Sequence, residues 1–409
     1  MLNWAKQFSI FCLLDNHQYQ IEPHTVECML AAGSKRNITG DIDSLKKLQK
    51  FIDEKPGWLF GHLNYDLKNE IEGLSSSHAD RIEFPELFFF EPEYIVRLSG
   101  NEVVIEAGDP RQVFESILNS GINQPGISNT VTAISNRISK IEYIDIIRKL
   151  QQHILRGDCY EINFCQEFFS ENVHLDPLSV YEKLSAVSPN PFSALYKLND
   201  KYLICASPER FLKKQGSQIL SQPIKGTAKR NLSERADDER LKETLYKSKK
   251  DRSENVMVVD LVRNDLAKVC KEGTVQVDEL YGVYSFPQVY QMISTISGEL
   301  RNDISFTEII RATFPMGSMT GAPKRNVLRL IEQFEKSKRG IFSGALGYIT
   351  PEQNFDFNVV IRSIMYNETR RYLSYQVGSG ITFYSEPENE WDECLLKAEA
   401  INKVLTGKK

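Results

Sequence analysis

The sequence lacks the marks of membrane, secreted and fibrous proteins. No apolar run approaches the roughly 20 residues that a membrane helix needs, and the first eleven residues include Lys6 instead of an unbroken apolar core. The seven cysteines are odd in number and scattered, and none of them form a C-x-x-C pair, which argues against a disulfide framework and a cysteine-ligated zinc site. We therefore expect a cytoplasmic protein with reduced, buried thiols and no membrane partner.

The sequence also lacks an excess of basic residues. Its formal net charge is -5, whereas nucleic-acid binding requires a basic face that neutralises phosphates, so we expect no nucleic-acid partner. All six histidines precede residue 175, which disfavours a Ser-His-Asp triad, a Cys-His pair or a histidine-ligated zinc site in the rest of the chain. A general acid or base in that remainder must therefore be a carboxylate or an amine.

What is present indicates a folded protein in two parts. The 409 residues suffice for one large core or two ordinary ones. Residues 1–125 form a part that is predicted to be β-rich, because short apolar runs alternate with glycine and proline breaks. These strand-like runs are 8–14, 58–63 and 87–90. Residues 119–136 are polar and aperiodic, as is typical of a linker, and residues 137–409 form the second part.

Helices and strands follow one another unevenly in the second part. Ser139 and Glu142 form a capping-box pattern that opens a helix, and Gly157 ends it. Further strand-like runs lie at 162–169, 194–198, 202–206, 359–365 and 372–377. Helical patterns lie at 234–266, 305–314 and 324–334. The uneven order predicts an α+β fold with a mixed sheet.

Carboxylates at helical spacing are candidates for a metal site. Glu390, Glu393 and Lys397 are spaced i, i+3 and i+7, which places them on one stripe of a C-terminal helix. Glu254 precedes an apolar helical run. Mg²⁺ is usually held by one or two carboxylates together with substrate oxygens and water, so Glu254 and Glu393 suit it. From spacing alone, a row of solvent-exposed ion pairs is the simpler interpretation of these residues.

Lys225 is a candidate nucleophile. It stands between Pro223 and Gly226, at the edge of a strand and before a glycine turn, with Lys229 and Arg230 close behind. An amine must be neutral to attack, and desolvation and neighbouring positive charges both lower the pKa of a lysine. We expect Lys229 and Arg230 to supply that repulsion. Without further information, a solvated surface lysine is the simpler interpretation.

Glu209 is a candidate general acid. It lies in the segment 207–211 at the end of a strand, where active-site side chains are common, and it would need burial to raise its pKa towards neutrality. An ion pair with Arg210 or another cation is the alternative.

Gly378, Ser379 and Gly380 follow a strand and can let backbone N–H groups approach an anion. So short a glycine pattern is weak evidence for an anion site.

Five motifs in fixed order resemble one family, the chorismate-utilising enzymes. They are Ser-Pro-Glu-Arg-Phe at 207–211, Pro-Ile-Lys-Gly-Thr at 223–227, the run 254–265, Thr-Gly-Ala-Pro-Lys at 320–324 and the Glu-Glu-Lys stripe at 390–397. The resemblance covers about residues 137–405. Residues 1–125 resemble the N-terminal region of the anthranilate-forming members more faintly, through 13–14 and 61–66.

The resemblance implies a fold and a set of ligands. It implies an α+β fold in which β-sheets are sandwiched between helical layers, and a chorismate site with Mg²⁺ on the ring carboxylate of the substrate. By motif, Glu254 and Glu393 correspond to metal ligands, and Glu390 and Asp251 to residues that act through water. The positions that correspond to substrate-binding residues are Gly226, Thr227, Tyr348, Arg362, Gly378, Ser379, Gly380 and Lys397.

The residue at 225 distinguishes branches of this family. It aligns with an alanine in the anthranilate, isochorismate and salicylate branches, whereas a lysine implies the branch that forms 4-amino-4-deoxychorismate for 4-aminobenzoate and folate synthesis. The resemblance then implies that Lys225 attacks ring C2, Glu209 protonates the departing C4 hydroxyl, and ammonia displaces the lysine. It also implies a separate glutamine amidotransferase subunit as the source of ammonia.

Two residues depart from the family pattern. Glu161 stands where water-adding members have lysine and amine-adding members usually have glutamine, and Gln291 stands where histidine is common. These departures disfavour a water-adding reaction and weaken an anthranilate assignment, while the roles of the two side chains stay open. The alternatives are an anthranilate-forming component and a non-catalytic, chorismate-binding relative.

Overall fold

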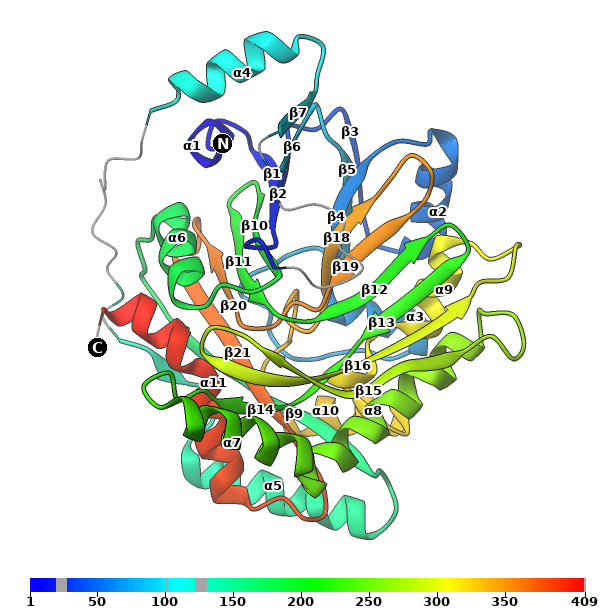
Figure 1. The fold of residues 1–409 in the computed structure, drawn as a ribbon, viewed down its shortest axis with the longest axis vertical. Coiled ribbons are helices and arrows are strands. Elements are labelled where there is room, and N and C mark those ends of the chain that lie inside the picture. Colours follow the sequence, from blue (N-terminus) through cyan, green and yellow to red (C-terminus); the bar gives the residue numbers. More distant parts are fainter. Residues whose placement is uncertain (20–27, 101, 122–130, 132, 408–409) are drawn as a thin grey trace.

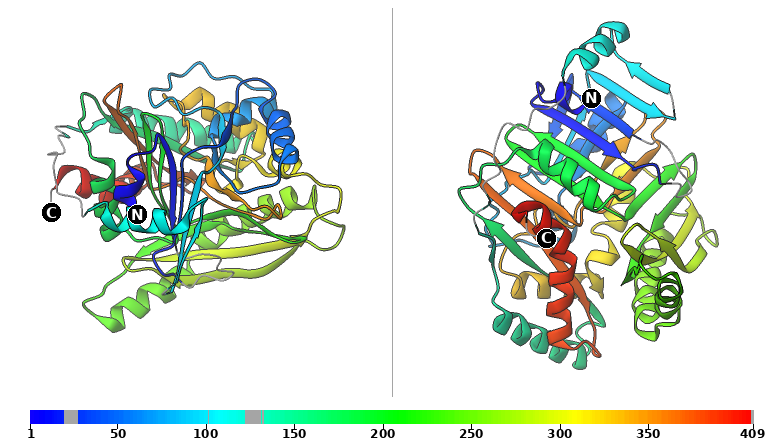
Figure 2. Two further views of the ribbon diagram at one scale, coloured as in Figure 1. Left: turned by 90° about the horizontal axis from the view of Figure 1, so that it is seen from above. Right: turned by 60° about the vertical axis from the view of Figure 1, so that its left-hand side comes forward.

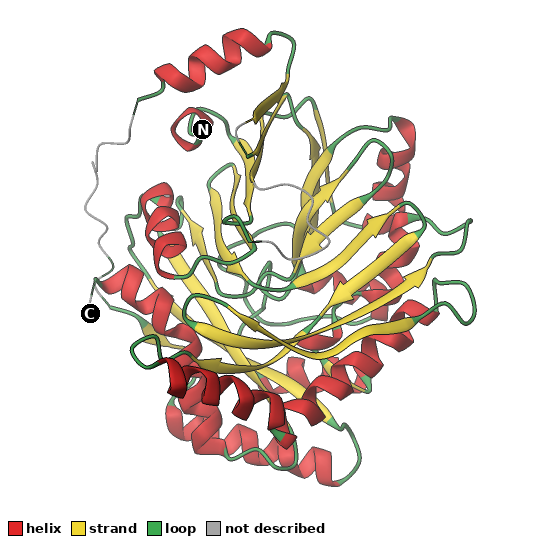
Figure 3. Cartoon of the chain, in the orientation of Figure 1, coloured by secondary structure: helices red, strands yellow, loops and turns green. Residues whose placement is uncertain are grey.

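Two large antiparallel sheets form the centre of the molecule. The computed structural model describes residues 1–19, 28–100, 102–121, 131 and 133–407, and it places the strands in the middle with helices around them (Figure 1, Figure 3). Every strand pair among these residues is antiparallel. The predicted α+β class with helical layers is confirmed, whereas the predicted mixed sheet is wrong.

The first sheet has eleven strands within the described residues. In spatial order they are β17 (Gly321–Ala322), β9 (Glu161–Ser170), β21 (Tyr372–Ile381), β20 (Ser363–Asn367), β11 (Lys201–Ser207), β10 (Phe192–Leu198), β1 (Ile10–Asp15), β2 (Cys28–Ala32), β6 (Tyr94–Ser99) and β7 (Glu102–Glu106), and β8 (Ser135–Asn136) pairs with β9.

The second sheet has ten strands within the same residues. In spatial order they are β14 (Ile224–Lys229), β16 (Val289–Glu299), β13 (Gln218–Gln222), β12 (Arg210–Gln215), β19 (Phe355–Asn358), β18 (Ala345–Ile349), β4 (Leu59–Leu63), β5 (Leu87–Glu91) and β3 (Arg36–Thr39), and β15 (Gln276–Ser285) pairs with β16.

Both sheets combine strands from the two predicted parts of the chain. In the first sheet, β1 lies between β10 and β2. In the second, β4 pairs with β18. One buried core joins the sheets, and His62 of β4 reaches across it to the hydroxyl of Tyr196 in β10, 3.1 Å from Nδ1. The division into 1–125 and 137–409 stays a prediction, since most of the expected linker lies outside the described residues.

Helices cover the outer faces of both sheets. On the first sheet lie α5 (Lys140–Leu155), α6 (Pro177–Val187), α10 (Lys324–Phe334) and α11 (Pro387–Thr406), which share a second core with it (Figure 2). Against the second sheet lie α2 (Ser44–Glu54), α7 (Arg235–Lys247), α8 (Lys249–Ala267) and α9 (Phe306–Thr313). The other helices of the described residues are α1 (Leu2–Ala5), α3 (Lys68–Glu72), α4 (Pro110–Asn119), η1 (Tyr65–Leu67) and η2 (Gly317–Met319). Among the described residues, no helix has the length and apolar character that a bilayer crossing requires.

Local differences from the predicted elements have identifiable backbone causes. The helix expected over 234–266 divides at Ser248, which is extended and caps α8 with its side chain. The strand expected over 359–365 begins only at Ser363, because Arg362 adopts a left-handed conformation with φ of 50°. The remaining strand-like runs and the helices at 305–314 and 324–334 are confirmed within a few residues.

Candidate active site

Lys225 of β14, in the second sheet, is buried beside Glu161, the first residue of β9 in the first sheet. Its ammonium group donates a hydrogen bond to Oε1 of Glu161 at 2.8 Å, and the two side chains are only 10 % and 3 % exposed. Gly380 of β21 lies next to the pair, where an added Cβ would fall 2.8 Å from Nζ of Lys225 and 2.7 Å from Oε1 of Glu161. The interpretation of Lys225 as a solvated surface lysine is therefore wrong.

A β-bulge at Gly226 aims Lys225 into the site. The register between β14 and β16 shifts between Ile224 and Thr227, and Gly226 has a φ of +95°, which favours glycine. Bulges re-aim side chains next to active sites. The segment predicted as a glycine turn is thus a bulged strand, and Thr227 lies on it with its side chain exposed.

Carboxylates, not cations, dominate the surroundings of Lys225. Burial alone would lower the pKa of Lys225, but the negative charges of Glu161 and Glu254 raise it above its ordinary value. Arg230 is turned to Asp238, 2.7 Å from its Oδ2. The prediction that neighbouring cations lower the pKa of Lys225 is therefore wrong. The lysine must pass a proton to a neighbour before its amine can attack.

Glu209 lies buried between β11 and β12. Burial raises the pKa of Glu209 to about 7, although the Ser318 hydroxyl and the charge of Lys225 both act to lower it. Arg210 does not neutralise this carboxyl group, because its guanidinium binds Asp356 at 3.1 Å and Gln222 at 2.7 Å. A carboxyl group that is half protonated near neutral pH is suited to general acid catalysis.

Arg362 brings a positive charge to the same region. Burial lowers the pKa of Arg362 to about 10, and the charge of Glu209 opposes that shift. The guanidinium forms no ion pair with any of the residues that the structure describes. A guanidinium of this kind can bind a carboxylate of a ligand in a bidentate manner.

The opposite wall of the site comes from β21 and α11. Lys397 of α11 donates to the carbonyl oxygen of Gly378 at 2.9 Å and pairs with Glu393 at 2.7 Å. The pKa of Glu393 is lowered, chiefly by Lys397. Beyond Tyr375, β21 pairs with β9 on one side and has no β20 partner on the other, so this edge of 378–380 faces α11 and the site instead of another strand.

Three glutamates line the side of the site where α8 and α11 meet. Lys250 lies 3.4 Å from Oε1 of Glu390 and 3.9 Å from Oε1 of Glu254. Burial raises the pKa of Glu254 to about 7, with Lys225 opposing the shift and Glu161 adding to it. The helical stripe is thus a row of exposed ion pairs only in part, because the side chain of Glu393 is 40 % exposed and pairs with Lys397, whereas Glu390 is 1 % exposed.

The donor atoms on this side fit a hard cation. Oε1 of Glu254 and Oε2 of Glu390 are buried and accept no hydrogen bond, although burying a polar group without a partner is costly. Within the described residues, no three or more histidine, cysteine or acidic side chains form a cluster that could hold a metal ion by itself. Magnesium needs only one or two carboxylates when substrate oxygens and water complete its shell.

Polar atoms without partners concentrate around Lys225. Besides Glu254 and Glu390, buried atoms that accept or donate no hydrogen bond occur on Glu161 and Gln291. Gln291 lies opposite Thr227 in the register of β16 and β14, and it is completely buried. In the sequence, Gln291 is recognisable only as a departure from the family pattern. The unsatisfied atoms indicate that a polar ligand belongs in this space.

Comparisons with known proteins agree with this geometry. A family model described as chorismate binding enzyme matches residues 7–403. The chain belongs to the chorismate binding enzymes.

Individual relatives are similar over most of their length. The chain is 33 % identical to the anthranilate synthase component I-like protein of Synechocystis over 378 residues, which is 90 % of this chain and 76 % of that protein. It is 30 % identical to aminodeoxychorismate synthase component 1 of Bacillus subtilis over 366 residues, 85 % of this chain and 77 % of that one. Anthranilate synthase component I from Streptococcus pneumoniae has the same fold, with a TM-score of 0.80, 24 % identity and coverage of 93 % and 94 %.

One residue predicted to bind substrate lies elsewhere in this chorismate binding enzyme. The ring of Tyr348 packs against Trp58 and Phe60, with ring centroids 5.7 and 5.9 Å apart. It lines a separate cavity with Asp15 and Asn16 of the N-terminal part. The structure therefore brings together Lys225, Glu209 and the other predicted site residues, but not Tyr348.

The motifs at 254–265 and 320–324 support the site of this chorismate binding enzyme from behind. Lys324 reaches Oδ2 of Asp265 at 2.7 Å, and Lys268 pairs with Oδ1 of the same carboxylate at 2.8 Å. Asn163 of β9 binds the carbonyl oxygen of Ser318 through its amide at 2.8 Å. These contacts hold α8, α10 and the loop before β17 against the strand that carries Glu161. Sequence reasoning used both motifs but did not predict the pairing of Asp265 with Lys324.

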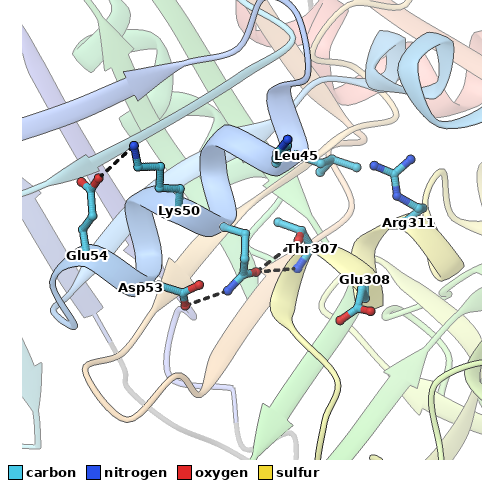
Figure 4. A pocket seen from close by; sticks show the side chains of 9 residues that line it. Leu45, Lys50, Asp53, Glu54, Thr307, Glu308 and Arg311 are labelled. Atoms are coloured by element: carbon cyan, nitrogen blue, oxygen red, sulfur yellow. Dashed lines mark hydrogen bonds and ion pairs between the residues drawn. The ribbon is translucent and has the colours of Figure 1, made fainter.

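A further hollow lies between α2 and α9, outside the site of this chorismate binding enzyme. It has a volume of about 670 Å³ and is open to solvent (Figure 4). Gln49 crosses it, accepting from Thr307 at 3.2 Å and donating to Asp53 at 2.9 Å. Both basic and acidic side chains line its walls, and it contains none of the predicted site residues.

Proposed function

We propose that this chain is the chorismate-aminating component of an aminodeoxychorismate synthase. It converts chorismate and ammonia to 4-amino-4-deoxychorismate, the precursor of 4-aminobenzoate in folate synthesis. The observation that carries the proposal is the buried Lys225, which electrostatically couples to Glu209, a carboxyl group whose pKa is about 7. A nucleophile and a general acid in one buried site suit the exchange of a ring hydroxyl for an amine.

The first half of the reaction uses three side chains. Lys225 passes a proton to Glu161, which accepts its hydrogen bond at 2.8 Å. The neutral amine then forms a bond to ring C2, the ring double bond shifts, and the C4–O bond breaks. Glu209 gives its proton to the departing hydroxyl, which leaves as water. The product of this half is a covalent adduct on Lys225.

In the second half, ammonia attacks C4 and the bond between Lys225 and C2 breaks as the double bond returns. Glu161 then returns its proton to the amine of Lys225, and the ammonium group formed on C4 gives a proton to Glu209, which restores the resting state of all three side chains. Overall, chorismate and ammonia give 4-amino-4-deoxychorismate and water. The carboxyl group of Glu161 beside Lys225 also offers an acceptor for the N–H groups of ammonia, because its Oε2 has no partner.

The surroundings suit a dianionic substrate. Arg362 and Lys397 supply positive charge, Thr227 a hydroxyl group, and the segments at 226 and 378–380 backbone groups. Mg²⁺, held by Glu254 and Glu393 with Glu390 beside them, would neutralise a carboxylate of the substrate. Ammonia is supplied by a glutamine amidotransferase subunit, the partner to which this component binds.

Product analysis tests the proposal. The purified chain is incubated with chorismate, ammonium and Mg²⁺, and the products are separated and identified by mass spectrometry. We expect 4-amino-4-deoxychorismate, convertible to 4-aminobenzoate by an added lyase. Direct release of anthranilate and pyruvate would instead assign the chain to anthranilate synthesis, and an inactive chain would favour a non-catalytic, chorismate-binding relative.

A matched pair of variants tests the covalent step. Lys225→Ala removes the proposed nucleophile, whereas Lys229→Ala removes an exposed lysine from the same strand. We expect an adduct on Lys225 in the intact mass of the parent and of Lys229→Ala after rapid quenching, and none in Lys225→Ala. Full activity of Lys225→Ala with ammonia would contradict the covalent mechanism.

A further inference from the structure

Lys250 occupies the space between the two helices that carry the acidic side of the site. It lies on α8, one turn before Glu254, and reaches across to α11. Its ammonium group is 3.4 Å from Oε1 of Glu390 and 3.9 Å from Oε1 of Glu254. The carboxylate charges of these two residues and of Glu393 keep the pKa of Lys250 above its ordinary value, although partial burial acts to lower it.

The contacts of Lys250 are weaker than those of the other two lysines in the site. Lys225 makes a hydrogen bond of 2.8 Å and is 10 % exposed. Lys397 is fixed by two partners, Glu393 at 2.7 Å and the carbonyl oxygen of Gly378 at 2.9 Å. Lys250 has longer contacts only, and half of its side chain is exposed. Of the three, it is the lysine that can move into solvent with the smallest loss.

The carboxylates that Lys250 approaches remain incompletely satisfied. Oε2 of Glu390 is buried on a side chain that is 2 % exposed, and it accepts no hydrogen bond. Oε1 of Glu254 accepts none either. One flexible ammonium group therefore balances negative charge that comes from both helices, without completing the hydrogen bonds of either carboxylate. A divalent cation would satisfy these oxygens at much shorter distances.

We propose that Lys250 is an internal counter-ion that holds the place of the divalent cation and swings into solvent when the cation binds. This inference rests on the proposed magnesium site. An ammonium group and a Mg²⁺ ion cannot share this space, because like charges a few ångströms apart repel each other. Lys250 therefore keeps the acidic side of the site stable before the metal arrives, and it reduces the affinity for the metal.

Binding of Mg²⁺ alone, without chorismate, tests the proposal by calorimetry. Lys250→Met removes the charge and keeps the length of the side chain, and Lys249→Met makes the same change at an exposed neighbour on the same helix. We expect Lys250→Met to bind Mg²⁺ about fivefold more tightly than the parent, because the cation no longer has to displace an ammonium group held by the attraction between unit charges about 4 Å apart in a well-hydrated setting. We expect Lys249→Met and the charge-retaining Lys250→Arg to stay close to the parent.

Thermal unfolding supplies a second readout that does not depend on catalysis. In EDTA, Lys250→Met should melt at a lower temperature than the parent, because Glu254 and Glu390 lose their counter-ion, and Mg²⁺ should remove that difference. Equal or weaker binding of Mg²⁺ by Lys250→Met would overturn the role of Lys250 and leave the metal site intact. If neither the parent nor Lys250→Met binds Mg²⁺, the proposed metal site itself fails, and the inference fails with it.

Discussion

The ammonium group of Lys225 donates a hydrogen bond of 2.8 Å to the carboxylate of Glu161. This pair joins the edge strand of one sheet to the first residue of a strand in the other, and it places the proposed nucleophile next to a proton acceptor. It also gives a structural meaning to a residue that departs from the pattern of the family. An acid at position 161 stabilises the charged lysine at rest and can receive its proton when substrate is bound.

Replacing Glu161 should slow the formation of the adduct on Lys225. Glu161→Gln keeps the shape of the side chain but removes the proton acceptor, and such groups typically contribute about 10²–10⁴-fold. We expect single-turnover formation of the adduct, followed by intact mass, to slow by at least about 10²-fold. Glu161→Asp keeps the carboxylate and should recover part of the rate. Parent-like kinetics in Glu161→Gln would remove Glu161 from the mechanism.

A side chain at Gly380 should disturb the pair without unfolding the protein. The Cβ of Gly380→Ala would lie 2.8 Å from Nζ of Lys225 and 2.7 Å from Oε1 of Glu161, at the flexible ends of both side chains. We expect kcat/KM to fall more than about tenfold, from misplacement of the nucleophile, with little change in Tm. Gly108→Ala, where a Cβ meets nothing within 4 Å, is the control. Unchanged kcat/KM in Gly380→Ala would show that the pair does not need this space.

The rate should fall at alkaline pH because Glu209 must carry a proton. Burial raises the pKa of Glu209 to about 7, so its acidic form is lost above that pH. We expect the rate of adduct formation to decrease about tenfold for each pH unit well above 7. Glu209→Gln should lack activity at every pH. A flat profile between pH 7 and 9 in the parent would contradict the role of Glu209 as general acid.

Ionisation of Glu209 should lower the stability of the folded protein, because the pKa of this carboxyl group is raised on folding. Its folded-state pKa of about 7 exceeds the ordinary value of 4.5. The stability that it contributes is therefore complete below about pH 4.5 and is lost as the pH rises through 7. Glu209→Gln is always neutral, so its Tm relative to the parent should be higher at pH 8 than at pH 5. A relative Tm that is higher at pH 5 than at pH 8 would mean that the folded protein ionises Glu209 without losing stability.

Removing the buried carboxylate of Asp265 should destabilise the fold. Asp265→Asn leaves the positive charges of Lys324 and Lys268 without their partner, and loss of one member of a buried pair typically costs about 3–5 kcal/mol. The matched control is Asp260→Asn on the same helix, whose pairing with Arg263 is exposed and worth about 0–1 kcal/mol. Urea unfolding measures both. Equal effects of the two variants would show that the pairing with Lys324 is not structural.

The sequence by itself determined the family, the α+β class and most local elements. Ser305 with Glu308 closes a capping box where a helix was expected, and the spacing of Glu390, Glu393 and Lys397 placed them on one helix. Caps, bulges and periodicity act between residues a few positions apart, so they can be read along the chain. The order of motifs also singled out Lys225 and Glu209, which composition and spacing alone left ambiguous.

Only the tertiary structure decided the electrostatic state of the site and the place of some residues in it. The neighbours of Lys225 along the chain are cations, yet its neighbours in space are Glu161 and Glu254, which reverse the expected direction of its pKa shift. Tyr348 packs against Trp58 in a separate cavity. Burial and Coulomb interaction depend on which distant strands and helices meet, and that depends on the packing of the whole chain.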